Sequence, residues 1–325
     1  MRLEDPVLTA CWHPAALARD VTDRPYPVTV LGEKLVLFRS GSGVHALKDL
    51  CIHRGVPLSL GKVDRGELVC AYHGWRYDGG GACVCIPSLP PRQPIPSKAR
   101  AEAYRCREEG GFVWVCLGEA EPERLPLQGK VDPALIPVWM GPYPVQAAAP
   151  RVVENFLDVS HLMFVHEGLL GDSRHAEIND YGVHRREDAL FTDEIVVYQP
   201  DPDGRGVGVE SRYVYEIFGP TCVKLVKRSS GSDEEFHLFL IVLPETATAC
   251  TAFMLQLRNY SPNVPEQVFI DFQNTLLAQD KVIVEAQKPE LLPLDLQAEL
   301  HLRSDRVAIA YRRMLREQGM TIGTE

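Results

Sequence analysis

Two cysteine–histidine pairs most constrain how this chain of 325 residues can fold. Cys51 and His53 form the first pair, and Cys70 and His73 form the second, with sixteen residues between the pairs. Each pair is followed directly or within two residues by a glycine, a residue typical of turns and loops. Thiolate and imidazole donors in two such loops suit one metal centre held between them. The fold must therefore bring the two loops together.

Two kinds of metal centre use two cysteines and two histidines. A zinc ion could take these four donors. However, zinc modules more often pair a knuckle with a helix, whereas these loops lie among strand-like runs. The alternative is a [2Fe–2S] cluster in which two histidines replace two cysteines on one iron, which is the Rieske centre. The surroundings favour the Rieske centre over zinc.

A second candidate metal site lies further along the chain, in the run RVVENFLDVSHLMFVH. We expect this run to form a helix that ends near Gly168, with Glu154, Asp158 and His161 on one face. His166 would lie about 140° around a regular helix from His161, so the turn towards the glycine must distort to bring the imidazoles together. Two neutral imidazoles and one carboxylate form the facial triad of non-haem Fe(II) oxygenases.

Length, charge and cysteine content exclude several classes of protein. The chain can bury a core large enough for two domains. A net charge of −10 and a pI near 5.5 argue against a nucleic-acid partner. No run of about 18 apolar residues predicts a membrane span, and the N-terminus does not resemble a secretory signal. Nine cysteines without a disulfide pattern predict a reducing, cytoplasmic location.

The pattern along the chain predicts an α+β protein with two domains. Residues 20–118 contain short apolar or alternating runs separated by glycines, which predict an antiparallel β domain. Residues 118–150 are charged and then rich in proline, and we interpret them as a linker. Further strands are expected within 183–258, and one long helix from Pro265 to about Gln287, gripped by a curved sheet. We place the domains at 1–125 and 126–325.

The motifs resemble those of a known enzyme family. CIHRGVPLSLGKV and CAYHGWRYDGGGACVCIPS resemble the Rieske domain of the Rieske non-haem iron oxygenases, and ENFLDVSHLMFVH resembles their catalytic-domain motif. The likeness extends from Trp12 to the C-terminus. Within the family, the chain resembles the α-only branch of oxygenases and O- or N-demethylases. DVSHLMFVHEGLLGD and HLRSDRVAIAYRRMLREQG are especially similar to the saxitoxin-pathway Rieske hydroxylases. This resemblance implies a helix-grip (START/Bet v 1-like) catalytic domain.

The resemblance also implies roles for single residues. The Rieske [2Fe–2S] cluster would be held by Cys51, His53, Cys70 and His73, whereas Cys83 and Cys85 lie outside the ligand pattern. The mononuclear Fe(II) would be held by His161, His166 and an aspartate of the long C-terminal helix, for which we choose Asp280 over its rivals Asp271 and Glu285. Asp158 would link the iron site to the Rieske centre of the next subunit, and Asn155 would lie near the iron.

The predicted function is that of a terminal oxygenase component, a monooxygenase that hydroxylates a C–H bond of a small organic molecule with O2. By the resemblance it would be a homotrimer. The resemblance also implies that electrons from NAD(P)H would arrive through a separate reductase or ferredoxin. No glycine-rich dinucleotide motif follows a strand here, so we expect that the chain itself does not bind NAD(P)H. Oxidative O- or N-demethylation is the alternative within the family. A Rieske electron carrier and a non-catalytic ligand-binding protein are the alternatives outside it. We expect the substrate pocket within 170–260.

Overall fold

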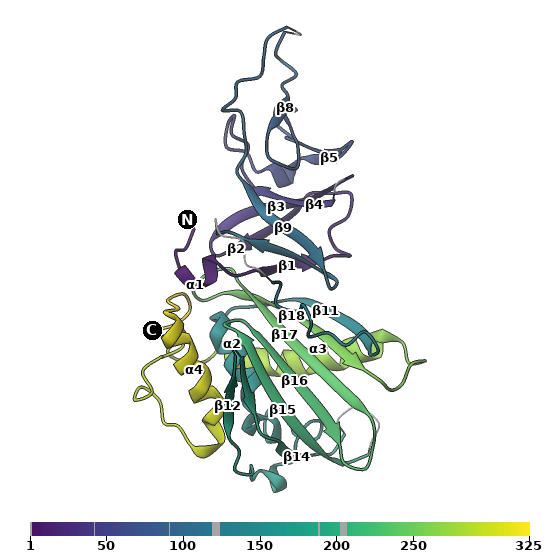
Figure 1. Ribbon diagram of the computed structural model, residues 1–325, viewed down its shortest axis with the longest axis vertical. Helices are drawn as coiled ribbons and strands as arrows, with labels where there is room; N and C mark the ends of the chain where they lie inside the picture. Colours follow the sequence, from purple (N-terminus) through teal and green to yellow (C-terminus); the bar gives the residue numbers. More distant parts are fainter. Residues whose placement is uncertain (1, 42, 91, 119–123, 188, 202–206) are drawn as a thin grey trace. The chain divides into compact units, whose positions relative to one another are not determined.

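The computed structural model describes residues 2–41, 43–90, 92–118, 124–187, 189–201 and 207–325. The chain forms two compact units, Met1–Leu125 and Pro126–Glu325 (Figure 1). No helix in the described ranges is long and apolar enough to cross a membrane. The predicted α+β class, with a β unit before a mixed unit, is confirmed.

The first unit consists of two antiparallel sheets. The larger sheet has the strand order β1-β10-β9-β4-β3-β2, and the smaller has the order β5-β6-β7-β8. The larger sheet contains β1 (His13–Leu17), β2 (Tyr26–Val30), β3 (Glu33–Ser40), β4 (Gly43–Lys48), β9 (Ala103–Glu109) and β10 (Phe112–Cys116). The smaller sheet contains β5 (Lys62–Asp64), β6 (Glu67–Val69), β7 (Arg76–Tyr77) and β8 (Cys83–Cys85). Two short helices, α1 (Pro6–Thr9) and η1 (Leu58–Leu60), complete the unit.

The apolar runs found in the sequence form the core of this unit. The run Phe112–Cys116 is buried along its whole length as β10. In β3, four successive residues from Leu35 to Phe38 are also buried, so both faces of this strand are covered. Burial of both faces explains why these strands read as continuous apolar runs rather than as an alternating pattern.

The second unit is a strongly bent antiparallel sheet with helices beside it. Its strand order is β11-β18-β17-β16-β15-β13-β12, and β14 pairs with β15 outside this order. The strands are β11 (Ile136–Val145), β12 (Val183–Arg186), β13 (Ala189–Thr192), β14 (Ile195–Gln199), β15 (Val209–Gly219), β16 (Cys222–Ser229), β17 (Glu235–Pro244) and β18 (Cys250–Arg258). The helical segments are α2 (Ala149–Leu157), η2 (Ser160–Met163), η3 (Ser173–His175), α3 (Glu266–Val284), η4 (Arg303–Asp305) and α4 (Arg306–Gln318).

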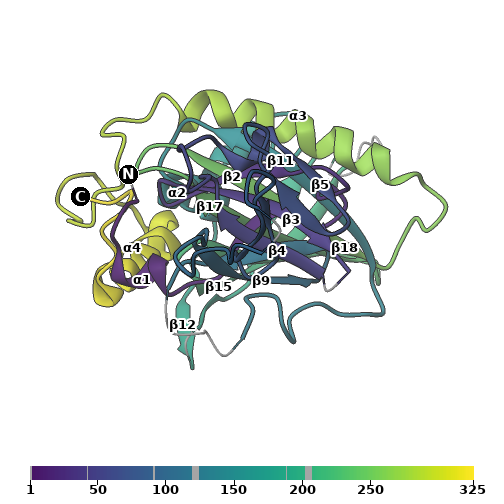
Figure 2. The same ribbon diagram turned by 90° about the horizontal axis from the view of Figure 1, so that it is seen from above.

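The long helix α3 lies across one face of this sheet, as the sequence predicted. It forms one uninterrupted helix, and α4 lies away from it near the C-terminus (Figure 2). The buried residues of α3 include Gln273, Leu276 and Leu277. Residues of β15 to β18 lie opposite, so the helix and the sheet enclose a space between them.

A buried ion network joins α2 to α4. Arg312 in α4 contacts both carboxylate oxygens of Glu154, at 2.6 Å from Nε and 2.7 Å from Nη2. Arg151 in α2 contacts Glu299 at 2.9 Å, and Glu299 also contacts Arg312. Both arginine side chains are nearly inaccessible to solvent. Each guanidinium therefore has a carboxylate partner, which a buried charge requires.

The predicted linker at 118–150 is partly wrong. Its residues 119–123 lie outside the described residues, but 136–145 form β11, which pairs with β18 at one end of the sheet order. Three of the prolines that suggested a linker, Pro137, Pro142 and Pro144, lie in this strand. Proline lacks the N–H that a central strand needs, but an edge strand tolerates it. The proline content therefore indicated an edge strand here rather than a connection.

Candidate active site

The two cysteine–histidine loops have the same backbone construction. In the first loop, the N–H of Cys51 donates to Val56 and the N–H of Gly55 donates back to Cys51, both at 2.8 Å. In the second, Cys70 and Trp75 pair in the same way at 2.8 Å, and the N–H of Gly74 donates to Cys70 at 3.0 Å. Both glycines have positive φ, at 73° and 68°, which other residues rarely adopt. Each turn therefore requires its glycine.

These loops pair the predicted donors by type, with the two thiols inside and the two imidazoles outside. Cys51 and Cys70 are each 2% exposed, within an apolar core to which strands of both sheets contribute. The Nδ1 atoms of His53 and His73 face each other at 3.2 Å on the exposed side, and the ring of His53 stacks on Trp75. Two thiols and two imidazoles divided in this way fit a Rieske cluster, with one iron on each side.

The surroundings of the four donors favour metal binding. Desolvation, with a smaller effect of the neighbouring His73 and Arg54, lowers the pKa of His53 and so favours the neutral imidazole that a metal binds. The hydroxyl of Tyr77 lies 3.2 Å from Sγ of Cys51, and burial followed by this contact raises the pKa of Tyr77. Tyr77 therefore keeps its proton and can donate it to the sulfur. Cys83, outside the ligand pattern, packs in the same core.

The chain around the second site is not the single helix that the sequence predicted. Helix α2 ends at Leu157, Asp158 is extended with φ −79° and ψ 109°, and the turn η2 follows at Ser160–Met163. One carboxylate oxygen of Asp158 accepts the N–H of Ser160 at 2.8 Å, which stabilises this break. The distortion therefore occurs before His161, where the Asp158 side chain competes with the helical backbone. Gly168, with φ 83°, ends the following turn.

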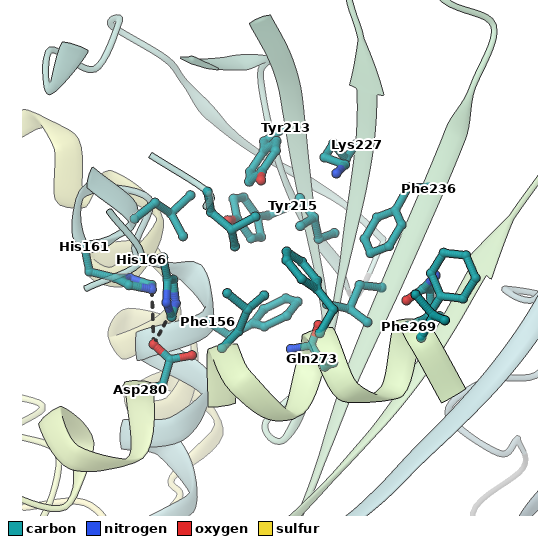
Figure 3. A pocket seen from close by; sticks show the side chains of 18 residues that line it. Phe156, His161, His166, Tyr213, Tyr215, Lys227, Phe236, Phe269, Gln273 and Asp280 are labelled. Atoms are coloured by element: carbon teal, nitrogen blue, oxygen red, sulfur yellow. Dashed lines mark ion pairs between the residues drawn. The ribbon is translucent and has the colours of Figure 1, made fainter. Parts of the chain in front are cut away.

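This break allows the two histidines to meet an aspartate of α3. The Nε2 atoms of His161 and His166 lie 3.4 and 3.1 Å from the same oxygen of Asp280, Oδ1 (Figure 3). One donor atom from each of the three residues lies within 4.8 Å of the others. The rivals lie elsewhere: Asp271 is exposed and accepts from Gln267, and Glu285 accepts the N–H of Gln146.

The electrostatics of the three groups fit a divalent cation. Burial alone would raise the pKa of Asp280, but its contacts with the two histidines lower the pKa overall. Burial likewise acts to lower the pKa of His166, but the Asp280 carboxylate raises it overall. The three groups thus favour a positive charge at a buried position, which is a proton on His166 when no metal is bound. A metal ion can replace that proton. The donor set of two imidazoles and one carboxylate suits Fe(II).

Gln279 is a residue of this site that no sequence motif indicated. His166 donates from Nδ1 to Oε1 of Gln279 at 2.7 Å. In the neutral imidazole, this hydrogen bond places the proton on Nδ1 and leaves Nε2, directed towards Asp280, available to bind a metal. The only sequence signal for Gln279 was its position next to Asp280. Adjacent residues on a helix point in different directions, so this position did not predict a contact with His166.

The other two predicted site residues, Asp158 and Asn155, are not members of this cluster. Asp158 is half-exposed, and its Oδ2 lies 3.8 Å from Nδ1 of His161, beyond hydrogen-bond length. Asn155 is half-buried on α2 and is not among the described residues that line the pocket. Phe156, the next residue, lines the pocket instead.

The three donors lie at one end of an apolar pocket between α3 and the sheet. The strand register places two rows of side chains on the inner face of the sheet. One row consists of Tyr215, Leu225, Leu238 and Gln256, and the next consists of Tyr213, Lys227, Phe236 and Arg258. All of these except Arg258 line the pocket. The expected range of 170–260 thus supplies the sheet side of the pocket, and α3 supplies the other.

The face of α3 towards the pocket is set by helical spacing. Phe269, Phe272, Gln273, Leu276 and Asp280 line the pocket at intervals close to one helical turn or its multiples. The same face therefore presents apolar side chains along most of its length and the candidate metal ligand at its C-terminal end. A planar apolar molecule in this pocket would have one end beside the three donors.

Two family models match the chain. The Rieske [2Fe–2S] domain matches residues 11–100, and the vanillate O-demethylase oxygenase C-terminal domain matches residues 145–319. The methylxanthine N1-demethylase NdmA of Pseudomonas putida is 31% identical, over 94% of this chain and 88% of that protein. The oxygenase component of dicamba O-demethylase from Stenotrophomonas maltophilia is 28% identical, over 85% of this chain and 86% of that protein.

Solved structures agree with these sequence matches. The structure of Pseudomonas putida CBB5 NdmA with caffeine has a TM-score of 0.83 and 31% identity, and the match covers 95% of this chain and 90% of that one. Dicamba monooxygenase bound to dicamba has a TM-score of 0.82 and 25% identity, covering 96% and 97% of the two chains. The likeness to saxitoxin-pathway hydroxylases stays a prediction.

Proposed function

This chain belongs to the Rieske non-haem iron oxygenases that include the vanillate O-demethylase oxygenase, and we propose that it demethylates a small aromatic molecule oxidatively. The family consists of oxidoreductases that use O2 and comprises N- and O-demethylases as well as monooxygenases. Both relatives described above are demethylases by name. Their likeness favours our alternative, demethylation, over simple hydroxylation of a carbon skeleton.

The proposed reaction begins like any C–H hydroxylation. One atom of O2 is inserted into a C–H bond of an O-methyl or N-methyl group, and the other atom leaves as water after taking up two electrons and two protons. The resulting hydroxymethyl group then separates from its oxygen or nitrogen as formaldehyde, while that heteroatom gains a proton. NAD(P)H supplies the two electrons through a separate reductase or ferredoxin.

The residues of the pocket divide the work of this reaction. His161, His166 and Asp280 would hold Fe(II), and Gln279 would fix the orientation of His166. A bound iron would supply the activation of O2 that oxygen insertion requires. The aromatic walls of the pocket hold a planar ring and exclude water from the reacting carbon. The substrate methyl group would lie next to the three donors.

Electron delivery depends on the first unit. Cys51, His53, Cys70 and His73 would hold the Rieske cluster, and electrons would leave it through the exposed His73. We propose that Asp158 of one subunit accepts this contact and links it to His161 within a homotrimer. The half-exposed carboxylate of Asp158, 3.8 Å from His161, supports such a bridge. We propose a cytoplasmic location, in line with the cysteine content noted in the sequence.

The observation that carries this proposal is the convergence of His161, His166 and Asp280 at the end of an apolar pocket. Iron analysis tests it: the holoenzyme should contain about three iron atoms per chain, whereas an electron carrier or a ligand-binding protein with the cluster alone would contain about two. With a surrogate reductase, an aromatic methyl ether or methylamine should cause O2 uptake matched by formaldehyde.

Variants separate the two metal sites. His161→Ala should reduce the iron content to about two per chain and abolish formaldehyde release, with the Rieske electron paramagnetic resonance signal intact. His184→Ala is the matched control, because His184 is an exposed histidine of the same unit that pairs with Asp193. Three iron atoms in His161→Ala would contradict the proposed ligand set.

A further inference from the structure

Two tyrosines form part of the pocket wall. Tyr213 and Tyr215 are the tyrosines among the described residues that line the pocket, and both project from β15. They are two residues apart, so their side chains lie on the same face of the strand. Their ring centres are 6.2 Å apart. Both residues are almost fully buried, so the two rings belong to the interior of the pocket.

The direction of α3 shows which end of the sheet lies near the metal donors. Near the start of this helix, the ring centre of Phe269 lies 3.9 Å from the guanidinium of Arg258, which pairs with the first residue of β11. Near its end, Lys281, which follows Asp280, donates from Nζ to the carbonyl oxygen of Pro144 at 2.8 Å. Pro144 lies near the end of β11. The helix therefore runs along the strands, and the metal ligand lies towards the end of β11.

Tyr215 lies closer to that end than Tyr213 does. The row of side chains that contains Tyr213 also contains Arg258, so it lies beside the start of α3. Four successive antiparallel pairings connect β11 to β15, so these two strands run in the same direction. Tyr215 is two residues further along β15, which places it about 7 Å nearer to the metal end of the pocket (Figure 3).

Contacts with α2 also place the Tyr215 ring near the metal donors. The ring packs edge-to-face against Phe156, at 6.0 Å between the ring centres. Asp158 follows two residues later, and its carboxylate lies 3.8 Å from His161. Burial, the neighbouring Tyr213 and then Asp158 raise the pKa of Tyr215 well above its usual value. Tyr215 therefore keeps its proton and presents a neutral phenol ring to the pocket.

A phenol is a reactive neighbour for a centre that activates O2. Its hydroxyl makes the adjacent ring carbons electron-rich, so electrophilic oxygen attacks them more readily than the aliphatic C–H bonds of Leu162 and Leu170, which also line the pocket. With a substrate in the pocket, the substrate receives the oxygen atom. Without a substrate, a reduced enzyme still has O2 and electrons available, and the pocket walls limit the access of water. The protein's own ring is then the reactive group at hand.

We propose that Tyr215 is a self-hydroxylation site, which the reduced enzyme converts into a catechol when no substrate is bound. This inference rests on the iron site of the proposed function but not on demethylation. One atom of O2 is inserted into the ring C–H bond next to the hydroxyl, and the hydrogen stays on the new hydroxyl group. The other atom leaves as water, with two electrons from NAD(P)H through the reductase and two protons from solvent.

Peptide mass spectrometry with isotopic oxygen tests this inference. The holoenzyme is incubated without substrate, with NADH, a surrogate reductase, catalase and O2 labelled with oxygen-18. Tyr215 should gain one labelled oxygen atom, in a fraction of chains at least about tenfold larger than for Tyr198, an exposed tyrosine of the same unit, because proximity to the donors accelerates the reaction. No added oxygen at Tyr215, unlabelled oxygen there, or equal or greater labelling of Tyr198 or Tyr213 would overturn the inference.

Two histidine variants show whether the second metal site is responsible. His161→Ala removes a metal donor and should abolish labelling of Tyr215, with an intact Rieske signal as evidence that the protein is folded. His184→Ala is the matched control, because His184 is exposed and pairs with Asp193, and its Tyr215 should be labelled as in the wild type. Labelling that persists in His161→Ala would show that an oxidant formed elsewhere attacks the ring, and the assignment would fail.

Formaldehyde measurements separate this inference from the proposed function. If the enzyme releases formaldehyde from an aromatic methyl ether or methylamine but adds no oxygen to Tyr215, demethylation stands and self-hydroxylation is refuted. If Tyr215 gains labelled oxygen in a His161-dependent way but no methyl ether or methylamine yields formaldehyde, the modification site stands and demethylation is refuted.

Discussion

Removal of one hydroxyl, in Tyr77→Phe, should lower the reduction potential of the Rieske cluster. The Tyr77 hydroxyl lies 3.2 Å from Sγ of Cys51, and both side chains are buried. Reduction adds negative charge to the cluster and its sulfurs, so a hydrogen bond to a sulfur stabilises the reduced state more than the oxidised one. The aromatic ring keeps its place in the variant, so the change is confined to this donor.

The size of the shift follows from the energy of one hydrogen bond. A hydrogen bond to a charged group contributes roughly 1.5–3 kcal/mol, and we take about 1 kcal/mol as the part that differs between the two redox states. For a one-electron couple, where 59 mV corresponds to a tenfold change, this is about 40 mV. We therefore expect Tyr77→Phe to have a potential lower by about 40 mV, with the cluster fully loaded.

A redox titration followed by electron paramagnetic resonance measures this shift. Tyr104→Phe is the matched control, because Tyr104 is a half-buried tyrosine of the same unit that lies beside Glu102 and Arg105 rather than the thiols. Its potential should equal that of the wild type. An unchanged or higher potential in Tyr77→Phe would show that this hydroxyl does not donate to the thiolate, and the argument would fail.

Three further changes test other parts of the structure. Asp158→Asn should leave both metal sites loaded but nearly abolish turnover, seen as slow re-oxidation of the reduced cluster with substrate and O2; near wild-type turnover would refute the proposed bridge. Gln279→Leu should weaken iron binding at the second site by about 10- to 100-fold in competition with a chelator, whereas the exposed Gln267→Leu should not. Burial lowers the pKa of His13 from 6.5 to about 4, so the folded state resists protonation that the unfolded state accepts. The free energy of unfolding should therefore decrease by about 3 kcal/mol as the pH falls from 6.5 to about 4. A proton resonance titration that gave His13 an ordinary pKa would contradict this prediction.

The first unit could be predicted from the sequence because its information is local. Each metal-binding loop carries its donors and its turn glycine within a few residues, so the spacing alone indicated the construction of both loops. The apolar runs between glycines likewise predicted β3, β6 and β10. Local patterns of this kind do not depend on knowledge of distant contacts.

The second unit was harder because its decisive features are not local. The break at Asp158 lies in a run whose apolar spacing continues without glycine or proline, and it depends on one side chain that accepts from Ser160. Asp280 could be chosen only by resemblance, since a carboxylate on a helix is usually solvated. Its position beside His161 and His166 required the packing of α3 on the sheet.

The prolines of β11 have a consequence for how this protein meets other chains. Every edge strand offers free N–H and C=O groups, and a passing strand of another molecule can pair with them. In β11, Pro137, Pro142 and Pro144 have no N–H to offer. A foreign strand that approached this edge would find the ladder interrupted three times. The same residues that made the segment look like a connection thus make this edge a poor template for a further strand.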